Sequence, residues 1–365
     1  MTFRFSIPRV RGRGAGLGNE LIPWARSFLA AQVVGAHALK PAFGLNKRRY
    51  WRHFGTPRYD WLIHKGLEYL LPVVEFKEVD YLRHGGGDFL DAFRKFADAE
   101  RLHERSNYLL VTEGMWGGYR HIAAARDFVT STLYQSRFAA PNLVCIQDSL
   151  QPKKLVVGMH VRLGDFGAAP IDLSAYQGKF NLALPLEWYR NIARSIIKQL
   201  GDDVQFLIVS DGTAEQLKLL LDEIPAVVTT DIPDSDCSDL LALAKADLLV
   251  CSVSSYSAWA AFLSDAPYIW FEPNLQQHQE GFYSIWGHEP EQKVKGGATR
   301  NALDNYSSAN EITHGRGLPV GIDGALPEEF LHNLLVFKAQ RQAESDLVQY
   351  GVVSMVQQSG ANKCT

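Results

Sequence analysis

Apolar positions along the chain alternate between two patterns, short continuous runs and runs in which an apolar residue returns with helical spacing. The first pattern is typical of buried strands and the second of helices that cover them. We expect strands at 3–10, 37–43, 73–79, 108–112, 155–161, 204–210, 226–230, 247–252 and 267–271. We expect helices at 21–34, 59–71, 88–104, 119–136, 185–200, 213–224, 236–246, 254–264 and 328–355. This alternation predicts an α/β protein with parallel sheets covered on both faces.

The chain divides into two such series. Its 365 residues are too many for one ordinary core, and a polar, proline-containing stretch at 141–153 lies between the series. We therefore expect a Rossmann-like domain at 1–150, a second doubly wound domain at 151–330 and a helical tail at 331–365.

The stretch LVVGMHVRLGDF at 155–166 places charged residues at the end of an apolar strand. His160 and Arg162 are two positions apart, so their side chains project from the same face. A planar guanidinium beside Gly164 suits a two-point grip on a phosphate, although a salt bridge with Asp165 would also explain Arg162. A histidine alone is usually a core residue, and the pairing with Arg162 favours a binding site.

Two further strands end in polar residues, and ligands of open parallel sheets bind beyond these carboxyl ends. Asp211 follows one strand, and Ser254, Ser255 and Tyr256 follow another, where they open a helix. Free N–H groups and hydroxyls at a helix start bind anions, and N-capping by a serine is compatible with that role.

The first strand leads into a glycine-rich turn at 11–20, which carries Gly14, Gly16 and Gly18. Such a turn lets a ligand approach the backbone. It matches neither the dinucleotide fingerprint nor a P-loop.

Two other features have simpler interpretations. Asp234-Ser235-Asp236 has the D-x-D form of a metal motif, yet it precedes a helix, where aspartates are ordinary caps. The basic and aromatic segment 47–58 is interpreted as a solvated face, with binding of an anionic acceptor as the alternative.

Composition narrows the function classes. Hydrophobic residues make up 46% of the chain and charged residues 21%, as in folded globular proteins. The net charge of -3 argues against a general nucleic-acid binder. The four cysteines show no C-x-x-C spacing, which predicts reduced thiols and no structural zinc. Since neither a secretory signal nor a membrane-spanning run is visible, we expect a cytoplasmic protein.

Three blocks together resemble the GDP-fucose-dependent fucosyltransferases of the α-1,2, α-1,6 and protein O-fucosyltransferase type. H-V-R-L-G-D at 160–165 resembles their H-x-R-x-G-D motif, and G-A-G-L-G-N-E at 14–20 resembles their N-terminal glycine block. The run at 246–251, followed by Ser254, Ser255 and Trp259, resembles their third block. The resemblance implies a GT-B fold, in which two Rossmann-like domains face a cleft, the donor on the second and the acceptor mainly on the first. It also implies an inverting, metal-independent reaction, with GDP-fucose as substrate and no cofactor.

The resemblance implies roles for individual residues as well. Arg162 would hold the donor β-phosphate, and His160 would line the nucleotide pocket together with Asp211. Asp247 would accept hydrogen bonds from the guanine edge. Phosphate and sugar would be contacted by Ser254, Ser255 and Tyr256. Asn19 would lie near the acceptor hydroxyl.

Two positions depart from the family pattern. Glu20 stands where the family has glutamine, and Leu163 stands where many members have a second arginine, which leaves the linkage class open. Glu20 is the candidate base, and Asp165 is an alternative base or the partner that orients Arg162. Other functions stay open: a GT-B transferase for a different nucleotide sugar, and a non-catalytic module that binds sugar nucleotides or glycans. The acceptor, a glycan or glycolipid, is not identified by any pattern.

Overall fold

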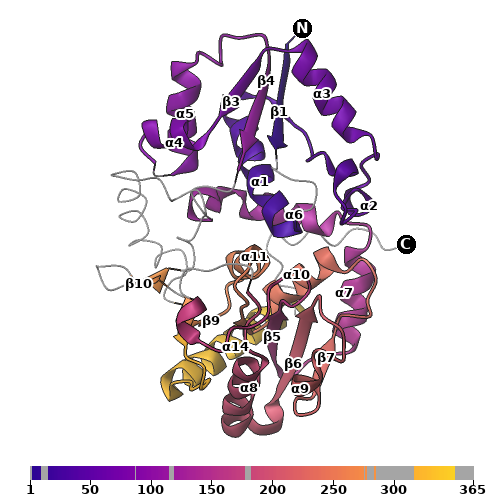
Figure 1. Cartoon of the computed structure of the whole chain (residues 1–365), viewed down its shortest axis with the longest axis vertical. Helices are drawn as coiled ribbons and strands as arrows, with labels where there is room; N and C mark the ends of the chain where they lie inside the picture. The colour runs from indigo at the N-terminus through magenta and orange to yellow at the C-terminus, as the bar shows by residue number, and fades with distance from the viewer. Residues whose placement is uncertain are drawn as a thin grey trace.

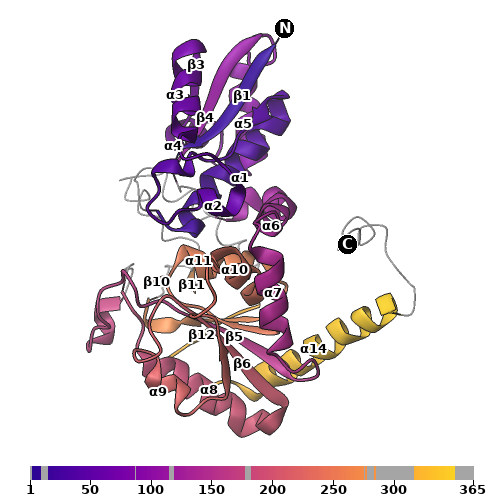
Figure 2. The same ribbon diagram turned by 90° about the vertical axis from the view of Figure 1, so that its right-hand side faces the viewer.

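The chain forms two α/β domains in succession, shown in the computed structural model of Figure 1. The structure describes residues 2–9, 15–86, 88–114, 119–176, 182–274, 276–277, 283–284 and 316–349. Each domain is built on a parallel sheet, and the step from one sheet to the other falls between β4 and β5. A second view, turned by 90°, shows the same two bodies stacked along the long axis (Figure 2).

The first sheet has four parallel strands in the order β2-β1-β4-β3. Its strands are β1 (Phe3–Arg9), β2 (His37–Ala38), β3 (Val73–Phe76) and β4 (Asn107–Glu113). The sequence predicted a longer second strand, to residue 43. Pro41 lacks the N–H that a strand interior needs, and the chain turns at Phe43 into a 3-10 helix.

Helices flank this sheet. They are α1 (Leu17–Val34), α2 (Trp51–Phe54), α3 (Asp60–Leu70), α4 (Glu78–Arg83), α5 (Phe89–Ala99) and α6 (Arg126–Tyr134), with short 3-10 helices at Phe43–Leu45 and Arg120–Ala125. The predicted start of the first helix was four residues late, because a proline is best tolerated in a first turn, whereas Pro23 lies inside α1. Gly35 closes α1 in the left-handed conformation, φ 64°.

The second sheet has six parallel strands in the order β12-β9-β8-β5-β6-β7. They are β5 (Leu155–Val161), β6 (Val204–Ser210), β7 (Ala226–Val228), β8 (Leu248–Val250), β9 (Tyr268–Phe271) and β12 (Gly317–Val320). Counted along the chain, this is the doubly wound Rossmann order 3-2-1-4-5-6. The order reverses between β5 and β8, so the ligand-binding crevice of such a sheet lies beyond the carboxyl ends of these two strands.

The elements around this sheet are mostly those predicted. The helices are α7 (Ala139–Asp148), α8 (Leu186–Leu200), α9 (Lys218–Leu221), α10 (Asp236–Lys245), α11 (Ser255–Leu263) and α14 (Glu328–Gln349), with 3-10 helices at Leu173–Tyr176, Gly201–Asp203 and Glu272–Asn274 and a small β10–β11 pair (Gln276–Gln277, Tyr283–Ser284).

Three predictions about these elements were wrong. The stretch 141–153 was expected to separate the two series without a helix of its own, but its first residues belong to α7, where Pro141 lies in the first turn and its missing N–H has no intrahelical role. The helix predicted at 213–224 is reduced to α9, and β12 was missed.

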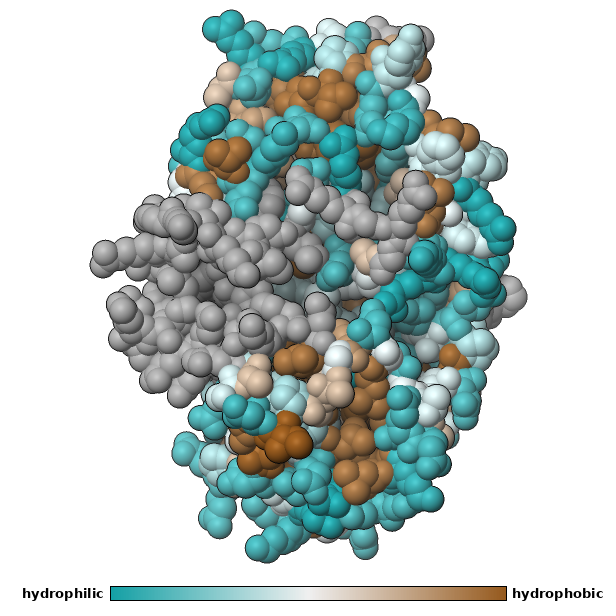
Figure 3. All heavy atoms as spheres, in the orientation of Figure 1, coloured by the Kyte–Doolittle hydropathy of each residue, from teal (hydrophilic) through white to brown (hydrophobic). Residues whose placement is uncertain are grey.

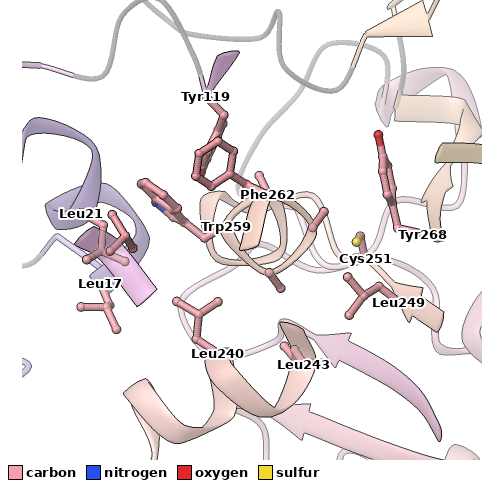
Figure 4. Close-up of a cluster of buried hydrophobic side chains, with 14 of the residues drawn as sticks. Leu17, Leu21, Tyr119, Leu240, Leu243, Leu249, Cys251, Trp259, Phe262 and Tyr268 are labelled. Carbon is pink, nitrogen blue, oxygen red and sulfur yellow. The ribbon is translucent and has the colours of Figure 1, made fainter. Parts of the chain in front are cut away.

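The two domains share a continuous apolar core where α1 meets α11. Trp259 of α11 crosses Tyr119 in a T-shaped contact, with ring centroids 4.9 Å apart. Its indole N–H donates to the carbonyl of Gly18 at 2.8 Å. Figure 4 shows Trp259 beside Leu17 and Leu21 of α1. Because α1 follows β1 and α11 follows β8, the carboxyl ends of the two sheets face one another, which is the GT-B arrangement that the family resemblance implied.

The surface is largely hydrophilic on the face seen in Figure 3, with apolar residues in patches on both domains. None of the helices in the described ranges is long and apolar enough to cross a membrane.

Candidate functional site

Arg162 follows β5 directly, beside the point where the strand order of the second sheet reverses. Its guanidinium binds two carboxylates: Nη1 lies 2.7 Å from Asp211 Oδ2, and Nη2 pairs with Asp165. The Arg162 side chain is 17% exposed, so the cation is held in a fixed position yet reachable from one side. This geometry suits an anion that arrives at the carboxyl end of β5.

Asp211 shapes the loop that carries this arginine. One of its oxygens accepts the backbone N–H groups of Leu163 at 2.8 Å and Gly164 at 3.0 Å. Gly164 is required here, because a Cβ at this position would lie 2.2 Å from Asp211 Oδ2. Asp211 therefore positions Arg162, which is a narrower role than the direct donor contact that the sequence suggested.

His160 lies two residues earlier, inside β5, with only 5% of its surface exposed. Its Nδ1 is within hydrogen-bond distance of Ser257 Oγ (2.7 Å) and Ser252 Oγ (2.9 Å). Burial, and then the Arg162 charge, lower the pKa of His160 to about 3, so the ring is neutral at physiological pH. A neutral imidazole fixed by serines serves to shape the site, and its ring also lies 4.9 Å from that of Tyr256.

The start of α11 points its free backbone N–H groups to the same sheet edge. Ser254 is the N-cap, and its Oγ accepts the N–H of Ser257 at 3.2 Å. The N–H groups of the first residues, Ser255 and Tyr256, have no acceptor within the helix. Together with the helix dipole they favour an anion. The Tyr256 hydroxyl donates to the Asp236 carbonyl, so it braces α10 against α11.

Gly18 and Asn19 bring the first domain onto this helix start. Asn19 Oδ1 accepts the hydroxyl proton of Ser255 at 2.6 Å. A Cβ on Gly18 would lie 2.6 Å from Ser255 Oγ and 2.9 Å from the backbone N of Tyr256. Gly16 is the extended N-cap of α1, and Gly14 lies outside the described residues. The glycine-rich turn thus allows two helix starts to touch.

Asp165 lies between two arginines of different domains. It pairs with Arg162, and its Oδ2 lies 2.8 Å from Nη2 of Arg48. Partial burial opposes ionisation, but Arg162 and then Arg48 hold the pKa of this carboxyl below its usual range. A carboxylate that is stabilised in this way is a poor proton acceptor, which argues against Asp165 as the base.

Glu20 is buried inside the first domain, with 5% of its surface exposed. Its Oε1 accepts from Asn46 Nδ2 at 2.7 Å. Burial raises the pKa of Glu20 to about 7, against the opposing effect of the Asn46 hydrogen bond. The pKa suits a base, but the burial places the carboxylate beneath the segment that carries Asn46 rather than at an open surface.

The structure does not bring Asp247 to the site. This residue precedes β8, so it lies at the amino edge of the sheet, opposite to Arg162. Its Oδ2 accepts the backbone N–H of Val156, and its carboxylate pairs with Lys338 at 2.9 Å and Arg341 at 3.3 Å. Asp247 thus anchors α14 to the sheet, and the expectation that it reads a guanine base is corrected.

Asp239 is a second buried carboxylate, which the sequence analysis did not single out. It lies in the first turn of α10, at the carboxyl edge of the sheet, and is 6% exposed. Its Oδ2 accepts from Ser235, and the buried Thr229 hydroxyl lies against the same carboxyl. Burial raises the pKa of Asp239 to about 7. The carboxyl also lies near Tyr256, whose own pKa it helps to raise.

The D-x-D and the basic segment contact each other across the domains. Asp234 Oδ1 lies 2.7 Å from Arg52 Nη1, and Asp236 lies 3.6 Å from the buried His53. Arg48 and Arg52 therefore face the second domain, and the interpretation of segment 47–58 as a purely solvated face is wrong for both. Within the described ranges, no three His, Cys, Asp or Glu side chains are grouped as metal ligands.

Comparisons by sequence find no matching family model and no matching curated protein. Solved structures with a similar course of the chain include fucosyltransferase NodZ from Bradyrhizobium, with 12% identity, a TM-score of 0.43 and coverage of 73% of this chain and 95% of that one. A mutant of Arabidopsis thaliana FUT1 in complex with GDP has 11% identity and a TM-score of 0.40, over 73% of this chain and 70% of that one. E. coli ADP-heptose lps heptosyltransferase II has 12% identity and a TM-score of 0.37, over 86% and 99%.

Proposed function

We propose that this chain is a glycosyltransferase that moves fucose from GDP-fucose to a hydroxyl of a glycan or glycolipid acceptor. The observation that carries the proposal is the position of Arg162, a cation fixed at the carboxyl end of β5 where the strand order reverses. This is the crevice where doubly wound sheets bind nucleotides. The proposal also uses the three sequence blocks that resemble fucosyltransferases.

The donor diphosphate would lie between Arg162 and the start of α11. Arg162 offers two N–H groups to one phosphate, and the N–H groups of Ser255 and Tyr256 offer a second set of donors. Both sets belong to the second domain. Ser254 keeps the helix start in place through its cap on Ser257.

The guanine base is assigned to Asp239 in place of Asp247. Guanine presents two adjacent N–H donors, and an ionised carboxylate accepts both. The Asp239 carboxyl lies at the carboxyl edge of the sheet, where it accepts from Ser235 and lies against the Thr229 hydroxyl. Tyr256 is an electrostatic neighbour of Asp239, and its ring contacts His160, which in turn is near Arg162, so these two rings would line the nucleoside pocket.

In the proposed reaction the acceptor hydroxyl oxygen attacks the anomeric carbon of fucose, the bond from that carbon to the β-phosphate oxygen breaks, the hydroxyl proton passes to water, and GDP leaves. Direct displacement inverts the anomeric configuration. Negative charge grows on the β-phosphate, where Arg162 and the α11 dipole stabilise it, so the proposal includes no metal. Loss of one such preorganised donor typically costs about a hundredfold in rate.

The first domain would supply the acceptor side. Asn19 lies where α1 meets α11, and its Oδ1 accepts the hydroxyl proton of Ser255. Its Nδ2 group can donate a hydrogen bond to a hydroxyl of the glycan or of the fucose. Glu20 is assigned to support of the adjacent segment rather than to proton transfer, because its carboxylate is buried against Asn46.

Transfer from a different nucleotide sugar is the second candidate. Arg162 and the α11 start recognise a diphosphate and not a base, so they would serve ADP- or UDP-sugars as well. Asp239 is the residue that favours guanine, because adenine offers a ring-nitrogen acceptor where guanine offers an N–H.

The experiment is a ligand panel followed by turnover. Purified protein is titrated with GDP, ADP and UDP in a thermal-shift assay, and then incubated with GDP-fucose and a glycan mixture while free GDP is measured. The proposal expects the largest shift with GDP, and GDP release that depends on the glycans. Preference for another nucleotide would replace the donor, and binding without glycan-dependent release would indicate a non-catalytic module.

A further inference from the structure

Arg48, on the first domain, shares a carboxylate with the donor-site arginine of the second. Asp165 receives Arg162 on one oxygen and Arg48 on the other, the latter at 2.8 Å. The side chain of Asp165 is 59% exposed and that of Arg48 32% exposed. An ion pair this exposed contributes little to stability, so stability does not account for the way in which Arg48 is held.

The loop that carries Arg48 is built in detail. Asn46 Oδ1 accepts the backbone N–H of Arg48 at 2.9 Å, and Asn46 Nδ2 donates to Glu20 at 2.7 Å and to the Ala15 carbonyl at 3.1 Å. Asn46 therefore ties the loop to the start of α1. The buried Glu20 carboxylate has its role here, since it fixes the amide that orients Arg48.

The other end of the loop is fixed as well. Arg49 adopts a left-handed backbone conformation, φ 60°, which costs a non-glycine residue free energy. Tyr50 is 1% exposed, and its hydroxyl accepts the N–H of Leu17 at 2.8 Å. Asn46 and Tyr50 thus fix both ends of the loop to the first turn of α1, which contacts the start of α11. The loop is held in place on both sides of Arg48, whose side chain extends toward Asp165 and Arg162.

A carboxylate held between two guanidinium groups occupies the place that a phosphate group would take, because both are oxyanions in which two oxygens can accept the paired N–H donors of a guanidinium. A diphosphate carries more charge than one carboxylate and offers more oxygens. We propose that Arg48 binds the diphosphate of the donor together with Arg162, and that Asp165 holds this place until the nucleotide arrives. The inference rests on the proposed function and adds a phosphate-binding residue from the first domain to it.

Calorimetry on three variants tests the inference, with GDP, ADP and guanosine as probes. Arg48→Ala should weaken GDP binding about tenfold or more, the typical effect of losing a hydrogen bond to a charged group, and leave guanosine binding unchanged. Asp165→Asn should bind GDP at least as tightly as the wild type, because the competing carboxylate charge is removed. Lys47→Ala is the matched control, an exposed cation one residue away, and should match the wild type. Circular dichroism melts check that each variant is folded.

Each other result decides against one of the two claims. Unchanged GDP affinity in Arg48→Ala would overturn the role of Arg48 and leave the proposed function intact. Equal losses in Arg48→Ala and Asp165→Asn would mean that the pair only holds the domains together. If the wild type binds ADP but not GDP, and Arg48→Ala weakens ADP binding, Arg48 remains a diphosphate ligand and guanine is excluded. A wild-type protein that binds neither nucleotide would overturn the proposed function itself.

Discussion

Gly18→Ala is the substitution for which the geometry gives the clearest expectation. The new Cβ would lie 2.6 Å from Ser255 Oγ and 2.9 Å from the Tyr256 backbone N, where ordinary contact begins at 3.4 Å. The starts of α1 and α11 must therefore separate by about 0.5–0.8 Å. Overpacking of this kind costs about 1–3 kcal/mol.

We expect Gly18→Ala to slow turnover of GDP-fucose more than it weakens the binding of GDP. Arg162 and the start of α11 belong to the second domain, and Arg48 is the one proposed phosphate ligand on the first, so we expect GDP affinity to fall by no more than about tenfold, the effect of losing Arg48 itself. The acceptor side belongs to the first domain, and a misplacement of about 1 Å can cost about a hundredfold in rate. GDP release from GDP-fucose with a glycan mixture should therefore fall by about tenfold to a hundredfold.

The matched control is Gly66→Ala, in the middle of α3, where a Cβ would meet nothing within 4 Å. This variant should turn over at the wild-type rate and gain about 0.5–1 kcal/mol of stability, since alanine is the better helix former. If Gly18→Ala released GDP as fast as the wild type and melted at the same temperature, close contact between the two helix starts would not be needed, and this reasoning would be wrong.

Three further substitutions separate binding from folding. Asp239→Asn should weaken GDP binding about tenfold or more without loss of stability, and wild-type GDP affinity should rise as pH increases through about 7, because guanine binds the ionised carboxylate. Asp247→Asn should lower the free energy of unfolding by about 2 kcal/mol, because its ion-pair partners lie on α14, and it should leave GDP affinity unchanged. A loss of GDP binding without a loss of stability would restore Asp247 as the guanine ligand. Glu20→Gln should keep near-wild-type turnover, which a catalytic base would not allow. Burial raises the pKa of Glu20 from 4.5 to about 7, so its contribution to stability is complete below pH 4.5 and is lost as pH rises through about 7. The wild-type stability minus that of Glu20→Gln should therefore fall by about 3 kcal/mol between pH 4 and 8 in urea unfolding.

Much of the second domain could be predicted from the sequence, because its strands are buried on both faces and read as continuous apolar runs. The position of Arg162 at the site followed from the same reasoning, since it ends the run of β5. The helix α7 was missed, because a proline in a first helical turn is hard to distinguish from a proline in a connecting segment. β12 is short and contains a proline, so its pairing with β9 depends on tertiary contacts.

The candidate site was only partly accessible to such reasoning. Asp247 lies at the start of its strand, so the direction of the chain alone places it at the amino edge of the sheet. The family resemblance nevertheless led to its assignment as the guanine ligand. Asp239 also had a signal, since it lies in the first turn of a predicted helix and so at the carboxyl edge. The meeting of Arg48 with Asp165 had none, because it depends on how the two domains are oriented and not on local pattern.

The central claim is that Arg162 binds the phosphates of a GDP-linked donor. Isothermal titration of wild-type protein and Arg162→Ala with GDP, and with guanosine on the same preparations, tests it directly. The account predicts GDP binding that weakens about tenfold or more in Arg162→Ala, while guanosine binds both proteins equally. Equal affinity of the two proteins for GDP would contradict it.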